Sequence, residues 1–129
     1  MSIPVSGLNV VVNTEADKLI VVAVGEIDLF TISSFEPPVM KVISDVIAGS
    51  DQRQMAIDLT DVEFIDSCCL ALLLRACHSM RDAGHEFCLM LGRDTQPARV
   101  LRLGRFDTLM AMHYVDDLQG ALSLSSAPV

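Results

Sequence analysis

A chain of 129 residues, 51% of them hydrophobic and only 5% aromatic, has material for one domain with a core of aliphatic side chains. Its 9 basic and 17 acidic residues leave a formal charge of −8, which disfavours nucleic-acid binding because phosphate backbones require clustered Lys and Arg. The longest apolar runs, 19–24 and 68–74, are too short to span a membrane, and residues 1–10 lack signal-peptide features. We therefore expect a cytoplasmic protein with no membrane contact and with its 4 cysteines reduced.

The first elements in chain order are two strands. Residues 8–13 and 18–26 are rich in β-branched side chains and flank the short stretch TEAD, which predicts a hairpin. The second run is apolar on both faces, as expected of a strand in the interior of a sheet.

A helical period follows between Ser34 and Gly49. Ser34 is the predicted cap, and Gly49 is predicted to end the helix. Pro37 and Pro38 fall in the predicted first turn, where backbone N–H groups have no intrahelical partner. The side chains expected on the buried face are Phe35, Val39, Val42, Ile43, Val46 and Ile47.

Strands and helices alternate in the remainder of the chain. Within its longest predicted helix, we expect Leu70, Leu73, Leu74 and Cys77 to face the sheet. The predicted elements are a strand at 54–59, a connection at 60–66, a helix at 68–83 that ends at Gly84, a strand at 86–91, a short helix at 96–103 between Thr95 and Gly104, a strand at 112–115, a helix at 116–124 and a frayed tail at 125–129.

This order of elements predicts an α/β fold. We expect a small mixed β-sheet of about four or five strands, formed by an N-terminal hairpin and then βα alternation, with helices packed against it. One domain is expected over residues 1–129, with its core at about 8–124.

The cysteines raise the question of a thiol enzyme, a redox site or a metal site. A nucleophilic thiol needs a nearby base, but His78 lies nine or ten residues beyond Cys69 and Cys68. Adjacent cysteines diverge by about 100° on a helix, and no C-x-x-C or H-x-x-x-H spacing occurs. We therefore expect no enzyme activity, no metal and no cofactor. Buried positions are expected for Cys69, Cys77 and Cys88, whereas Cys68, near a helix start, keeps some potential reactivity.

Asp66 and Ser67 lie at the start of the same helix and have two interpretations. Both residue types are favoured helix caps, and capping alone accounts for one of them. Alternatively, a hydroxyl at an exposed helix N-terminus is a suitable phosphoacceptor, because unpaired N–H groups and the helix dipole favour added negative charge. The residues alone leave both interpretations open.

Three stretches of the chain, in this order, resemble the STAS domain of bacterial anti-sigma-factor antagonists. They are VAVGEIDLFT, MAIDLTDVEFIDSCCLALLL and GHEFCLMLGRDTQPARVLRLGRFDTLM, and the resemblance extends over about residues 8–124. The most specific parts are the G-E-x-D stretch at Gly25, Glu26 and Asp28, and the D-L-x-x-V-x-F-I-D-S stretch that ends at Ser67.

The resemblance implies a STAS fold and a binding function. Members of the family bind an anti-sigma factor that is also a serine kinase, and thereby release a sigma factor. The kinase phosphorylates the Ser that follows the Asp, which corresponds to Ser67, and a phosphatase reverses the modification. Because Asp28 and Thr31 match the loop beside this Ser, the implied partner-binding residues are Asp28, Thr31, Asp66, Ser67, Cys68 and Cys69.

Two positions depart from the family pattern. Cys69 replaces the usual Gly, which adds bulk where the kinase approaches, and Arg105 replaces a Gly near the end of the chain. Two other roles remain open: a STAS subunit of another signalling or transport complex without a serine switch, and a redox sensor that uses Cys68. An exposed edge of the N-terminal hairpin would also allow two copies to pair as a homodimer.

Overall fold

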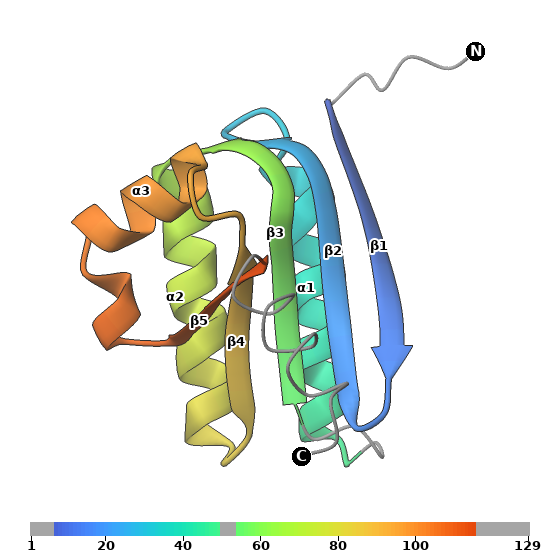
Figure 1. Ribbon diagram of the computed structural model, residues 1–129. Coiled ribbons are helices and arrows are strands. Elements are labelled where there is room, and N and C mark those ends of the chain that lie inside the picture. Colours follow the sequence, from blue (N-terminus) through green and yellow to red (C-terminus); the bar gives the residue numbers. More distant parts are fainter. Residues whose placement is uncertain (1–6, 50–53, 116–129) are drawn as a thin grey trace, which may run out of the picture.

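The computed structural model describes residues 7–49 and 54–115, which form one five-stranded sheet with helices packed on it (Figure 1). The first two strands pair antiparallel and every later pair is parallel. The predicted α/β fold, an N-terminal hairpin followed by βα alternation, is therefore confirmed. The order in the sheet is the order in the chain: β1 (Leu8–Glu15), β2 (Lys18–Ile27), β3 (Gln54–Ile65), β4 (Glu86–Leu91) and β5 (Ala111–Tyr114).

Helices α1 (Ile32–Ile47) and α2 (Ser67–Asp82) pack on one face of the sheet, and the core lies between them and this face. Val21, Ile57 and Leu89 stand in register across β2, β3 and β4, and all three are fully buried. Burying each such side chain contributes about 1.5–3 kcal/mol, so aliphatic packing is the main force that holds the helices on the sheet.

Helix α1 begins earlier than predicted. Its N-cap is Thr31, and Ser34 lies within the first turn, where its N–H donates to the Thr31 carbonyl over 2.8 Å. The prediction of Ser34 as the cap was wrong because the carbonyl of Asp28 accepts hydrogen bonds that extend the helix toward the preceding loop. Pro37 and Pro38 consequently lie in the second turn, inside the helix, where each removes a backbone donor.

The apolar face of α1 is buried as predicted, with one exception. Ile47 is 46% exposed because it is the last residue of the helix and lies at the margin of the buried face. Gly49 follows the helix with a φ of +93°, a conformation that favours glycine and confirms its predicted role in ending the helix.

Strand β3 is longer than predicted and continues through residues 60–65, which the sequence assigned to a connection. Val62 and Ile65 are buried, whereas Asp61, Glu63 and Phe64 are exposed, and the pairing with β2 shifts its register here, so burial does not alternate strictly. This irregular pattern with two acidic residues resembles a loop in the sequence. The strand therefore runs directly into the N-terminus of α2.

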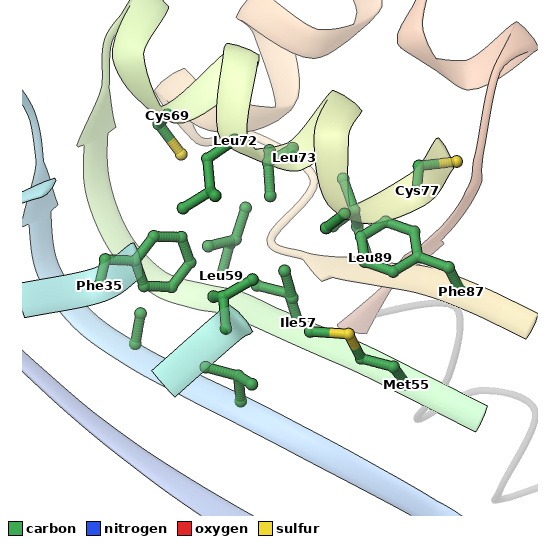
Figure 2. Close-up of a cluster of buried hydrophobic side chains, with 14 of the residues drawn as sticks. Phe35, Met55, Ile57, Leu59, Cys69, Leu72, Leu73, Cys77, Phe87 and Leu89 are labelled. Atoms are coloured by element: carbon green, nitrogen blue, oxygen red, sulfur yellow. The ribbon is translucent and has the colours of Figure 1, made fainter. Parts of the chain in front are cut away.

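Helix α2 begins one residue earlier than predicted, at Ser67. Leu73 and Cys77 are buried, but Leu70 and Leu74, which we expected to face the sheet, are only half-buried. The inward face of α2 instead includes Cys69 together with Cys77, both of which were predicted to be buried. The buried residues are Cys69, Leu72, Leu73, Ala76, Cys77 and Met80, several of which appear in Figure 2 with Phe35, Ile57 and Leu89.

Helix α3 (Gln96–Leu103) has the predicted boundaries. The hydroxyl of Thr95 accepts a hydrogen bond from the N–H of Ala98, and Gly104 caps the other end. A short 3-10 helix, η1 (Phe106–Thr108), follows α3 and was not predicted.

The last described strand, β5, starts one residue earlier than expected, at Ala111. The predicted helix at 116–124 and the predicted tail at 125–129 lie outside the described residues. Within the described ranges, no helix is both long and apolar enough to cross a membrane.

Candidate functional site

A compact turn built by Asp28 and Thr31 joins β2 to α1. The Asp28 N–H donates to the Thr31 hydroxyl over 2.9 Å, and the Asp28 carboxylate accepts from the N–H groups of Phe30 and Thr31 over 2.9 and 3.1 Å. The Thr31 hydroxyl donates in turn to the carbonyl of Glu26 over 2.8 Å. Thr31 is 2% exposed and Asp28 is half-buried, so Thr31 holds the turn from inside while Asp28 reaches the surface.

Gly25 allows the chain to enter this turn. Its φ is +124°, and a Cβ at this position would lie 2.0 Å from the carbonyl oxygen of Gly7. The N–H of Glu26 donates to the same oxygen over 3.1 Å. The glycine of the G-E-x-D stretch is therefore required by the close approach of the chain just before β1.

Asp66 links the turn to the start of α2. It is the N-cap of the helix, and its Oδ1 accepts from the N–H groups of Cys68 and Cys69 over 2.9 and 3.4 Å. Its Oδ2 accepts from the N–H of Leu29 over 3.0 Å, and its own N–H donates to the carbonyl of Ile27 over 3.2 Å. One carboxylate therefore caps the helix and fixes the neighbouring loop.

Ser67 is the first residue of α2 and is exposed, and its hydroxyl makes no hydrogen bond among the described residues. Asp66 performs the capping, which leaves this hydroxyl available for modification. The N–H groups of Cys68 and Cys69 already bond to Asp66. A phosphate on Ser67 would not find these two donors unpaired, contrary to the expectation from the sequence.

The two cysteines after Ser67 lie in different environments. Cys68 is half-buried, whereas Cys69 is fully buried, and Figure 2 shows the Cys69 side chain in the hydrophobic core. Burial, followed by the Asp66 carboxylate, raises the pKa of the Cys69 thiol. Cys69 and Thr31, for which the family resemblance implies partner contact, both have buried side chains. The bulk of Cys69 therefore enters the core and not the surface beside Ser67.

Gln96 supports the site from α3 and was not anticipated from the sequence. Its side-chain amide donates to the carbonyl of Ile65 over 3.0 Å and accepts from the Ile65 N–H over 2.9 Å. The amide thus pairs with both backbone groups of the residue that precedes Asp66, as an adjacent strand would. A contact across 31 residues leaves no signal in local sequence patterns.

Three exposed apolar side chains lie in the turn and the strand next to the site and were also missed. Leu29 and Phe30, in the turn that Asp66 holds, are 66% and 85% exposed, and Phe64, at the end of β3, is 40% exposed. Large apolar side chains at a surface indicate a protein contact when they gather at one place. In the parts of the chain that the structure describes, no group of three or more His, Cys, Asp or Glu is placed to hold a metal ion.

The family model of the STAS domain matches residues 8–121, and the chain belongs to the STAS domain family. This confirms the resemblance noted in the sequence. No curated protein sequence matches the chain.

Several solved structures share the fold. An anti-sigma factor antagonist from Mycobacterium paratuberculosis has a TM-score of 0.75 at 22% identity, over 92% of this chain and 96% of that protein. An anti-sigma-factor antagonist (STAS) domain protein from Planctomyces limnophilus has a TM-score of 0.65 at 17% identity, over 87% and 95%. The Bacillus cell fate determinant SpoIIAA, solved in its phosphorylated form, has a TM-score of 0.60 at 13% identity, over 88% and 99%. At these identities the likeness establishes the fold.

Proposed function

We propose that this chain is a cytoplasmic anti-sigma-factor antagonist switched by phosphorylation of Ser67. In this proposal it binds an anti-sigma factor of the serine-kinase type, which frees a sigma factor, and a phosphatase restores the active form. Membership of the STAS family and the presence of anti-sigma factor antagonists among its structural neighbours support the binding role. The single observation that carries the switch is the exposed, unbonded hydroxyl of Ser67 at the first position of α2.

The charge of a phosphate explains how the modification would end binding. It adds about −1.5 to −2 charge next to the Asp66 carboxylate, where the nearest helical N–H groups are already bonded. The protein itself stays folded because the hydroxyl is exposed and holds no other group in place. A partner surface fitted to the neutral hydroxyl would have to bury this charge unpaired, at a penalty of several kcal/mol.

The exposed apolar residues around Ser67 support a protein as the ligand. The turn that carries Leu29 and Phe30 is fixed by hydrogen bonds within it and by the bond from Leu29 to Asp66, so the positions of these side chains are set before a partner arrives. A preorganised apolar surface loses little conformational entropy on binding. Phosphorylation of Ser67, in the helix that Asp66 links to this turn, would therefore add charge next to the apolar surface.

The proposal is tested with Ser67→Ala and Ser67→Asp. Ser67→Ala is used to capture the anti-sigma factor from a lysate of the source bacterium, and the captured kinase is then purified and titrated against each variant. We expect Ser67→Ala to bind and to resist phosphorylation by this kinase, and Ser67→Asp to lose binding while keeping a native melting profile. Ser44→Asp, at an exposed serine of α1 three turns from the site, is the matched control and should bind like the parent protein.

Three outcomes contradict parts of the proposal. If Ser67→Asp binds as tightly as the parent protein, phosphorylation of Ser67 is not the switch. If the kinase labels Ser33, Ser34 or Thr60, the phosphoacceptor is misassigned. If the capture yields only transporter or scaffold subunits, the chain is instead a STAS subunit of another complex.

A further inference from the structure

A cluster of exposed arginines lies on α3 and on the loops at its two ends, in a chain that is acidic as a whole. Helix α3 lies at the side of the molecule away from β1 (Figure 1). Asp94 is the one acidic residue within this stretch of the sequence. The cluster, called here the arginine surface, holds 4 of the 9 Lys and Arg residues of the chain: Arg93, Arg99, Arg102 and Arg105.

The helical period brings an apolar side chain into this surface. Arg99 lies three residues before Arg102 and four before Leu103, so the three side chains share one face of α3. The buried residues of α3 lie on the opposite face. Leu103 is 84% exposed, although it is a large apolar residue. Positive charges and one exposed leucine therefore face solvent together.

The guanidinium groups are oriented by backbone carbonyls and not by carboxylates. Arg99 donates to the carbonyl of Asp94 over 3.2 Å, and Arg102 donates to the carbonyl of Arg93 over 3.5 Å. Arg99, Arg102 and Arg105 form no ion pair with a carboxylate among the described residues. Because a guanidinium has five N–H donors, most donors of these groups stay available to an anion.

One aromatic ring holds two of the guanidinium groups near each other. The guanidinium carbons of Arg93 and Arg102 lie 4.7 and 5.6 Å from the centroid of the Tyr114 ring, and Arg102 also donates to the Tyr114 hydroxyl over 3.3 Å. Each contact with the ring is attractive, but the two like charges beside it repel each other. An anion that contacts both arginines would offset this repulsion.

The backbone of Arg105 adds an independent observation. Its φ is +61°, in the left-handed region that favours glycine. The turn fixes this conformation, since the Arg105 N–H donates to the Arg102 carbonyl over 3.0 Å and the Arg105 carbonyl accepts from the Thr108 N–H over 3.1 Å. The Arg105 side chain is exposed and makes no hydrogen bond among the described residues. An arginine that is unfavourable for the backbone and unused in the fold indicates a role for its charge.

We propose that the arginine surface binds an acidic segment of a partner protein, whose carboxylates contact the guanidinium groups and whose apolar side chain packs on Leu103. Charge complementarity requires an anion, and the exposed leucine favours a protein over a free inorganic ion. The formal charge of −8 on the whole chain disfavours nucleic acid. The surface does not include the Ser67 hydroxyl, and the proposal does not depend on the antagonist function.

The test uses a fluorescein-labelled synthetic peptide of repeated Glu-Leu-Glu-Glu units, titrated with the whole chain and followed by fluorescence anisotropy. One control peptide replaces every glutamate by lysine, another replaces every leucine by serine, and a labelled single-stranded DNA tests for nucleic-acid binding. We expect the glutamate–leucine peptide to bind at least about tenfold more tightly than the lysine peptide or the DNA, and about threefold more tightly than the serine peptide. Added salt should weaken its binding, because the contacts are exposed and screened.

Variants of the chain locate the peptide on α3. The double variant Arg99→Gln and Arg102→Gln should weaken binding of the glutamate–leucine peptide at least about fivefold. The double variant Lys41→Gln and Arg75→Gln removes the same charge from α1 and α2, where both residues form surface ion pairs, and should change binding by less than about twofold. Leu103→Ser should remove the preference for the glutamate–leucine peptide over the serine peptide.

Arg105→Gly separates binding from stability. Because glycine is favoured at this φ, the variant should keep or raise the melting temperature of the parent protein while it binds the peptide about threefold more weakly. The proposal is overturned if the glutamate–leucine peptide does not bind, if the lysine peptide or the DNA binds as tightly, if the double variant of α3 binds like its control, or if Arg105→Gly melts at a lower temperature with unchanged binding.

Discussion

The carboxylate of Asp66 and the N–H of Leu29 are 3.0 Å apart in space and 37 residues apart in sequence. The same carboxylate caps α2 through the N–H groups of Cys68 and Cys69. One side chain therefore orders both halves of the candidate site, the exposed turn after β2 and the start of the helix that carries Ser67. Loss of this carboxylate would therefore remove hydrogen bonds from both halves at once.

The double role of Asp66 predicts a graded response to substitution. Asp66→Ala removes the cap and the bond to Leu29, and we expect it to lower the free energy of unfolding by about 1–3 kcal/mol. Asp66→Asn keeps one oxygen that can accept from Cys68, and should lose about half as much. Urea denaturation measures both values. Equal losses for the two variants would show that the bond to Leu29, and not the cap, carries the stability.

The amide of Gln96 predicts a long-range effect on the same site. Gln96→Ala leaves the N–H and carbonyl of Ile65 without their partner, and we expect a loss of about 1–3 kcal/mol in the free energy of unfolding. Gln96→Glu keeps the acceptor and loses the donor, so it should lie between the parent protein and Gln96→Ala. Gln54→Ala, whose amide makes one exposed contact of 3.4 Å to Asp17, is the control and should change stability by less than about 0.5 kcal/mol.

The phase of α2 predicts which leucines hold the core together. Leu73 is fully buried, and Leu73→Ala should cost about 2–5 kcal/mol in chemical denaturation because it leaves a cavity. Leu103→Ala is the control, since Leu103 is 84% exposed, and it should change stability by less than about 0.5 kcal/mol. A loss below about 1 kcal/mol for Leu73→Ala would contradict the packing of α2 described above.

The thiols should react at different rates with iodoacetamide in the native protein. Cys68 should react fastest, Cys88 more slowly, and the buried Cys69 and Cys77 slowest, as read by peptide mass spectrometry. The sequence suggested that Cys88 is buried like the other two, but it is half-buried because its side chain faces away from α2. Uniform fast labelling of all four would contradict the core positions and favour a redox role.

The rate for Cys88 should also depend on pH in a defined direction. Burial raises its thiol pKa, and the charge of Lys18 opposes this only in part. A raised pKa means less thiolate at a given pH, so the alkylation rate should keep rising with pH beyond the ordinary titration of a thiol. A rate that reaches its plateau below the ordinary thiol pKa would contradict this prediction.

Local patterns in the sequence predicted most elements because their signals lie within a few residues. The Thr95 cap, the Gly49 and Gly84 stops and the β-branched hairpin were all recognisable in this way. The continuation of β3 was missed although Val62 and Ile65 are buried, because the exposed acidic residues Asp61 and Glu63 resemble a loop. The start of α1 was missed because it depends on hydrogen bonds in the preceding turn.

The candidate site was predictable in part. Asp66 and Ser67 stood out as residue types suited to a helix start, but the sequence did not decide which one caps it. The burial of Cys69 was predicted and is confirmed, whereas the burial of Thr31 depends on the orientation of the turn, which only tertiary packing determines. No local pattern marks Gln96 or Phe30. Gln96 matters because its amide pairs with Ile65, which lies 31 residues away in the chain. Phe30 matters because no segment of the described structure covers its side chain.

The strand order of the sheet determines when the site is completed as the chain is synthesised. In the sheet, strands β1 to β5 lie side by side in the order of the chain. Each strand that leaves the ribosome after β1 can therefore pair with a strand that was synthesised before it, so the sheet grows from one edge only. Asp66 and Ser67 emerge with β3, but the amide that holds Ile65 belongs to α3, a further 31 residues along the chain. A kinase that requires the finished geometry at Ser67 would therefore ignore nascent chains and modify only those whose C-terminal half has docked.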